Sequence, residues 1–151
     1  MTEGVVSWNA TYDDHPARVA SRRSIEMVAV RDKEGWLALY SDDAFIEDPV
    51  GPSPFDPRGA GLRGQERLSA YWDGTIATTE RLDFEINHSY AAGCEVANVG
   101  SITVYLPNNV RLQTNGVYVY RVEAGGAISS LRSYWEFDRA MGTMRPDLGP
   151  T

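Results

Sequence analysis

The chain has 151 residues, of which 42% are hydrophobic and 23% are charged, a composition typical of one soluble domain with a packed core. Its 21 acidic residues outnumber its 14 lysines and arginines, which gives a net charge of −7 at pH 7. Because phosphate groups repel such a surface, we expect neither nucleic acid nor an anionic membrane as a partner. The single cysteine, Cys94, excludes an internal disulfide and a cysteine-rich zinc site. With no signal peptide and no long apolar run, we expect a cytoplasmic protein.

Residues 1–14 and 139–151 are expected to form a flexible N-terminal segment and a C-terminal tail around a single domain at 15–138. The first half of that domain predicts three helices. Pro16 suits the first turn of a helix, and the apolar residues from position 17 onward have helical spacing, with Ser24 on the same stripe. Further helices are predicted over residues 32–40 and 65–78.

The second half predicts strands. In residues 81–90, apolar and aromatic side chains alternate with polar ones, which is typical of a strand with one buried face and places His88 on that face. More strands are predicted over 95–106, 110–122 and 127–137, separated by turn-forming residues. Helices followed by consecutive strands indicate an α+β domain. A sheet curved over such helices would enclose an apolar pocket.

Asp48 lies in the most informative segment, which runs from residue 41 to residue 51. The segment is predicted to contain a short edge strand, because Pro49 cannot donate a ladder hydrogen bond. Side chains alternate along a strand, so Asp48 shares one face with Ile46 and Val50. If that face meets a cavity, the loss of water would make Asp48 a better proton acceptor. The alternative is that Asp48 merely caps a turn.

The strings Asp42-Asp43-Ala44 and Glu47-Asp48-Pro49-Val50-Gly51 resemble the catalytic strand of bacterial Δ5-3-ketosteroid isomerases. Over residues 17–137 the chain is similar to actinobacterial SnoaL-like proteins of the nuclear-transport-factor-2-like superfamily. The resemblance implies a cone-shaped, curved antiparallel or mixed sheet, packed on three N-terminal helices and enclosing an apolar pocket. It also implies a cofactor-independent steroid Δ-isomerase, in which one carboxylate moves a proton within a 3-keto steroid.

Asp48 matches the catalytic base of that family. At the positions of the family's two donors to the substrate oxygen, this chain carries Ser24 and Tyr118 instead. A serine hydroxyl is a shorter and less acidic donor than a phenol, so this departure puts full isomerase activity in doubt. Tyr118 could supply a phenolic donor from the other wall. Alternatively, it is a sheet residue whose hydroxyl is satisfied elsewhere.

Four further residues are candidates for contact with substrate, in addition to Ser24. Trp72 and Trp135 match family positions that line the steroid pocket, and Leu131 shares the predicted face of Trp135, as does Phe137. His88 is a candidate because it lies on the predicted apolar face of its strand. Only two histidines occur, and no ligand cluster surrounds them, so we expect no metal site and no cofactor.

The sequence is consistent with three functions. The first is a steroid Δ5-isomerase-like enzyme with Asp48 as general base, and the second is a non-catalytic binding protein for a steroid-like apolar polycyclic ligand. The third is another SnoaL-like enzyme: a cyclase, a hydrolase or a dehydratase. For an epoxide hydrolase, the resemblance implies an Asp-Arg-Asp arrangement across the cavity, whereas Arg111 and Arg132 are predicted to face outward. We also expect a homodimer through the outer sheet face, and the proline-rich loop 52–57 is either a lid or a surface loop.

Overall fold

Over residues 1–148, which a computed structural model of the chain describes, one curved sheet contains eight strands. The strands run in the order β1-β4-β5-β6-β7-β2-β3, and β8 pairs with β6. Pairing is parallel between β1 and β4 and between β2 and β7, and antiparallel elsewhere, so the sheet is mixed. The strands are β1 (Val6–Trp8), β2 (Tyr40–Glu47), β3 (Leu62–Arg63), β4 (Arg81–Ala92), β5 (Glu95–Leu106), β6 (Val110–Val122), β7 (Ile128–Tyr134) and β8 (Arg145–Pro146).

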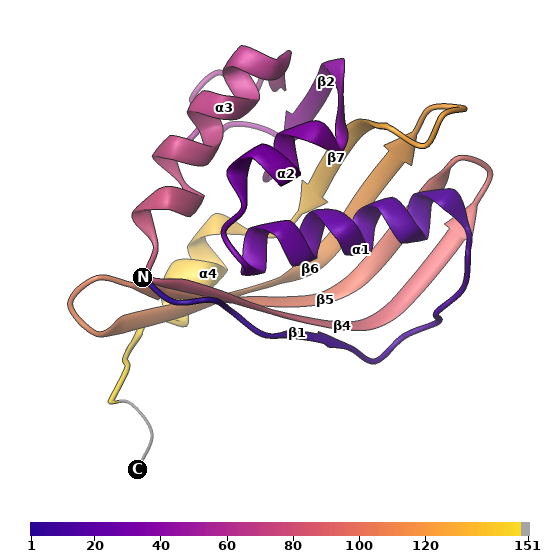
Figure 1. Cartoon of the computed structure of the whole chain (residues 1–151). Coiled ribbons are helices and arrows are strands. Elements are labelled where there is room, and N and C mark those ends of the chain that lie inside the picture. The colour runs from indigo at the N-terminus through magenta and orange to yellow at the C-terminus, as the bar shows by residue number, and fades with distance from the viewer. Residues whose placement is uncertain (149–151) are drawn as a thin grey trace.

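The helices precede most of the sheet in the sequence and cover its concave side. Figure 1 shows α1 crossing the long strands β4, β5 and β6, with α2 and α3 stacked beside it. The helical segments are α1 (Pro16–Ala29), α2 (Lys33–Ala38), α3 (Gln65–Gly74), a 3-10 turn η1 (Ile76–Thr78) and α4 (Phe137–Gly142). This arrangement confirms the predicted α+β fold with three N-terminal helices. In the described part of the chain, no helix is long and apolar enough to cross a membrane.

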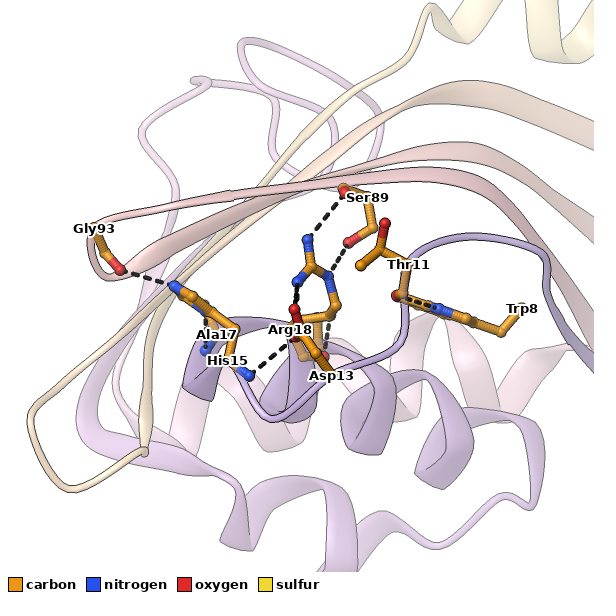
Figure 2. Close-up of polar contacts among 9 residues, drawn as sticks. Trp8, Thr11, Asp13, His15, Ala17, Arg18, Ser89 and Gly93 are labelled. Carbon is orange, nitrogen blue, oxygen red and sulfur yellow. Dashed lines mark hydrogen bonds and ion pairs between the residues drawn. The ribbon is translucent and has the colours of Figure 1, made fainter.

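His15 caps the start of α1 (Figure 2). Its Nδ1 accepts a hydrogen bond from the backbone N–H of Ala17 at 3.1 Å, and its Nε2 lies 3.0 Å from the carbonyl oxygen of Gly93. Since Nδ1 accepts, Nε2 carries the proton and donates to Gly93. The imidazole therefore joins the helix start to the turn between β4 and β5.

Arg18 has a buried side chain that holds the N-terminal segment against the sheet (Figure 2). The guanidinium donates to the hydroxyl and the carbonyl oxygen of Ser89 in β4, at 2.9 and 3.0 Å. Its remaining nitrogen, Nη1, donates to both carboxylate oxygens of Asp13 at 2.7 Å. These hydrogen bonds hold the pKa of the Asp13 carboxyl below its ordinary value. A buried arginine is tolerated here because its donors find partners.

A pair of glycines permits the close approach of neighbouring strands. Gly100 in β5 lies opposite Gly116 in β6. A Cβ at Gly100 would overlap the carbonyl oxygen of Glu85, and a Cβ at Gly116 would overlap that of Tyr134. Side chains at these two positions would therefore hold the neighbouring strands apart.

His88 occupies a β-bulge next to the point where β4 pairs with Gly100. The register of β4 against β5 shifts between Ile86 and His88, and a bulge interrupts the alternation of the two faces. Asn87 and His88 are both exposed as a result, and the inward face resumes at Ser89. The placement of His88 on the apolar face is therefore wrong.

Three further elements differ from those predicted from the sequence. Residues 1–14 contain a strand, β1, which pairs with β4. The last long strand ends at Tyr134, so Trp135 and Phe137 lie beyond β7, and Phe137 begins the unpredicted helix α4. Finally, β2 is not the edge strand, because the two-residue β3 pairs with its outer side.

Candidate functional site

A cavity of about 260 Å³ lies between the helices and the concave face of the sheet. Its volume is close to the lower limit for sites that bind drug-sized ligands. Most of its lining is apolar, and a few polar side chains enter it. The polar and aromatic lining residues that concern the chemistry are Ser24, Asp48, Tyr71, Thr114, Tyr118, Tyr120, Ser133 and Trp135.

Asp48 enters the cavity directly after the end of β2. Its Oδ2 accepts a hydrogen bond from the hydroxyl of Tyr71 at 2.6 Å, and its Oδ1 accepts one from Nε1 of Trp135 at 2.6 Å. The indole N–H can only donate, so the facing oxygen must act as an acceptor. Each carboxylate oxygen keeps a lone pair for another partner. The alternative of a simple turn cap lacks support, because both side-chain oxygens are engaged by residues distant in sequence.

Four tyrosines interact electrostatically with this carboxylate: Tyr40, Tyr118 and Tyr120, which are buried, and Tyr71, which is partly buried. Burial is the largest cause that raises the pKa of each phenol above its ordinary value, and the charge of Asp48 adds to all four rises. In Tyr71 the hydrogen bond to Asp48 raises the pKa further. All four phenols therefore stay protonated at neutral pH and can serve as hydrogen-bond donors.

The two predicted oxygen donors occupy different surroundings. Ser24 of α1 is buried and lines the cavity, and its Oγ lies 3.0 Å from the hydroxyl of Tyr40. Tyr118 of β6 also lines the cavity, and its hydroxyl lies 3.0 Å from Oγ1 of Thr114. If Thr114 donates in that pair, the phenolic proton of Tyr118 is free for a ligand.

The cavity brings some of the predicted contact residues together and leaves others out. Leu131 and Trp135 line it beside Asp48. Trp72 lies outside the lining and packs on Trp36, with their ring centroids 5.4 Å apart. His88 is also outside, exposed and stacked on Tyr90. Arg111 and Arg132 are exposed, as predicted, and Arg132 forms an ion pair with Glu47 at 2.9 Å.

Tyr71 is a candidate site residue that was not predicted from the sequence. It lies three residues after Leu68 in α3, and Trp72 lies four residues after Leu68, so helical spacing directs both aromatic side chains inward. Periodicity cannot decide which of the two reaches the carboxylate. The loop residue Phe55 also lines the cavity, its ring 6.4 Å from that of Phe137.

The chain is similar to one known domain family and to several solved structures. A model of the SnoaL-like domain family matches residues 21–131. The structure of RV0760c from Mycobacterium tuberculosis is 34% identical, with a TM-score of 0.80 over 89% of this chain and 98% of that chain. RV0760c has also been solved in complex with estradiol-17beta-hemisuccinate.

Two further solved structures are similar to this chain, one of them in fold alone. The Delta 5-3-ketosteroid isomerase from Mycobacterium sp. is 34% identical, with a TM-score of 0.78 over 87% of this chain and 98% of that chain. SalBIII, an epoxide hydrolase/cyclase-like enzyme of pyran ring formation in the polyether salinomycin, is 22% identical. Its TM-score is 0.71 over 89% of this chain and 98% of that chain, a likeness in fold alone.

Proposed function

Because the chain belongs to the SnoaL-like domain family, we propose that it is a cofactor-independent, steroid Δ5-isomerase-like enzyme. Its substrate is a 3-keto steroid or a similar polycyclic ketone, and Asp48 is the general base. The observation that carries this proposal is the carboxylate of Asp48, held by two hydrogen bonds of 2.6 Å at the wall of a mostly apolar cavity.

The geometry supplies what an intramolecular proton transfer needs. Apolar walls bind the ring system, and the free lone pairs of Asp48 accept the proton on the carbon next to the ketone. The electron pair released from that C–H bond moves toward the carbonyl oxygen, where hydroxyl donors such as Tyr118 stabilise the charge. The same carboxyl group then returns the proton two carbons away, which leaves the double bond conjugated with the ketone.

Asp48→Asn tests the role of the base with little disturbance of the structure. The amide oxygen can still accept from Trp135, and the amide N–H can donate to the hydroxyl of Tyr71, which can turn to accept. We expect folding and steroid binding to survive, while the conversion of 5-androstene-3,17-dione to its conjugated isomer slows about 10²–10⁴-fold. Ultraviolet absorbance of the product enone follows the reaction.

Asp42→Asn is the matched control, because Asp42 is an exposed aspartate on the neighbouring strand β2. It should keep the wild-type rate. An Asp48→Asn protein that isomerises the steroid as fast as the wild type would rule out the proposed base.

Ser24 supports a second candidate, a steroid-binding protein without turnover. The family's donor tyrosine is replaced by this serine, and the serine hydroxyl is already paired with Tyr40. Loss of one strong donor typically costs about 10²–10³ in rate. A steroid titration run beside the isomerase assay separates the candidates, because binding without any change in product absorbance favours the second.

A further inference from the structure

Ser133 carries a hydroxyl without a partner inside the cavity wall. The residue is 0% exposed, and its Oγ makes no hydrogen bond among the described residues. Three other buried side-chain atoms of the described chain share this property, in Arg22, Arg81 and Asn98, but those residues do not line the cavity. Among these four residues, Ser133 is thus the one that combines an unpartnered buried hydroxyl with a place in the cavity lining.

Ser133 lies between the two groups already assigned to the chemistry. In the pairing of β6 with β7 it is opposite Tyr118, and both side chains line the cavity. On the other side of β7, the parallel strand β2 pairs Glu47 with Arg132. Asp48 is the residue after Glu47 and Ser133 is the residue after Arg132, so the two lie at the same level of neighbouring chain segments. The backbone N–H of Val50 also donates to the carbonyl oxygen of Ser133 at 2.8 Å.

Three other hydroxyls of the wall already have a partner within the protein. Ser24 is paired with Tyr40, Thr114 with Tyr118, and Tyr71 with Asp48. Native proteins rarely leave a buried hydroxyl without a partner, because its desolvation is then uncompensated. An unmatched hydroxyl beside the base therefore indicates a polar atom on the ligand rather than a purely structural role.

The side chains around Ser133 indicate which kind of ligand atom its hydroxyl contacts. Asp48 only accepts hydrogen bonds, so it cannot form one with a ligand carbonyl oxygen, which also accepts. Such an oxygen needs a donor nearby. A serine hydroxyl offers one donor. We infer that Ser133 forms a ligand subsite for a ketone oxygen, to which it donates a hydrogen bond beside Tyr118. This inference rests on the proposed function for its substrate class, and it assigns the second donor to β7 instead of to Ser24.

Binding of two steroids that differ in one oxygen tests the subsite. Tryptophan fluorescence titrations would compare 5α-androstan-3-one with 5α-androstane, which lacks the ketone. In Ser133→Ala we expect the ketone to bind about five- to tenfold more weakly and the hydrocarbon to bind as before. Ser133→Cys, whose thiol is a weaker donor, should lie between the two.

Ser130→Ala is the matched control, since Ser130 lies on the same strand but, by alternation, on its other face. It should leave both affinities unchanged. Thermal melting of Ser133→Ala should show no loss of stability, because no hydrogen bond within the protein disappears. Unchanged affinity for the ketone, equal weakening of both ligands, or a wild type that binds neither steroid would overturn the subsite.

Failure of the subsite and failure of the proposed function give different results. If the wild type turns over no steroid but Ser133→Ala still weakens the ketone selectively, the subsite stands and the isomerase proposal falls. If Asp48→Asn abolishes turnover while Ser133→Ala keeps both turnover and ketone affinity, the isomerase stands and the subsite falls.

Discussion

Tyr71→Phe removes one oxygen atom from the site and with it one of the two donors to Asp48. The deleted hydrogen bond is 2.6 Å long and ends on a carboxylate. Hydrogen bonds to charged groups stabilise proteins by about 1.5–3 kcal/mol. The ring of phenylalanine fills the same space, so the cost comes from the lost donor rather than from a cavity.

This loss of free energy converts into a measurable change in melting temperature. For a chain of 151 residues, 1 kcal/mol shifts the midpoint by about 2–4 °C, so we expect a decrease of about 3–12 °C at pH 7. Steroid turnover should fall as well, by up to about 10²-fold, because Asp48 is then held by Trp135 alone. Calorimetry and the isomerase assay check the two effects.

Tyr90→Phe provides the matched control, because Tyr90 is 64% exposed and outside the cavity lining. It should melt close to the wild type. Removal of both donors, in Tyr71→Phe with Trp135→Phe, should cost more than the sum of the single changes, because the carboxylate is left without a donor. Additive losses, or a Tyr71→Phe protein as stable as the control, would refute the assigned geometry.

Two other predictions concern the fold around the site. The four tyrosines near Asp48 have pKa values raised mainly by the loss of solvent, whereas the unfolded chain ionises its tyrosines near pH 10. Stability should therefore fall as the pH rises above about 10. Urea melts and tyrosinate absorbance test this, and ionisation of all 8 tyrosines in the folded protein near pH 10 would contradict it. Gly100→Ala should lower the free energy of unfolding by about 1–3 kcal/mol through overlap with Glu85, whereas Gly125→Ala, which meets open space, should not.

The long elements were predictable because their signals are local. The predicted strands over 95–106 and 110–122 have the same bounds as β5 and β6, since alternation and turn residues mark both ends. The pairing of β1 with β4 and the bulge before His88 depend on contacts between distant segments. In the bulge, one extra residue reverses the faces of the strand locally, and alternation in the sequence cannot reveal this.

The site was predictable only in part, for a related reason. Asp48 stands out through its motif and through the apolar residues on its face. The partners that hold it come from α3 and from the chain after β7, and only the folded structure brings them to the carboxylate. The choice of Tyr71 over Trp72 depends on the position and rotation of α3 against the sheet, which helical periodicity does not determine.

Stabilisation of the substrate's ketone oxygen distinguishes an enzyme from a protein that only binds the steroid. A carboxylate that accepts two hydrogen bonds is held well in place beside the substrate. Proton removal from carbon also needs stabilisation of the charge that develops on the ketone oxygen, and Asp48 cannot donate a hydrogen bond to that oxygen. If Tyr118 and Ser133 provide this stabilisation, the cavity can turn the ketone over. If they do not, the same walls and the same carboxylate make a steroid-binding protein, so the donors on β6 and β7 determine the function.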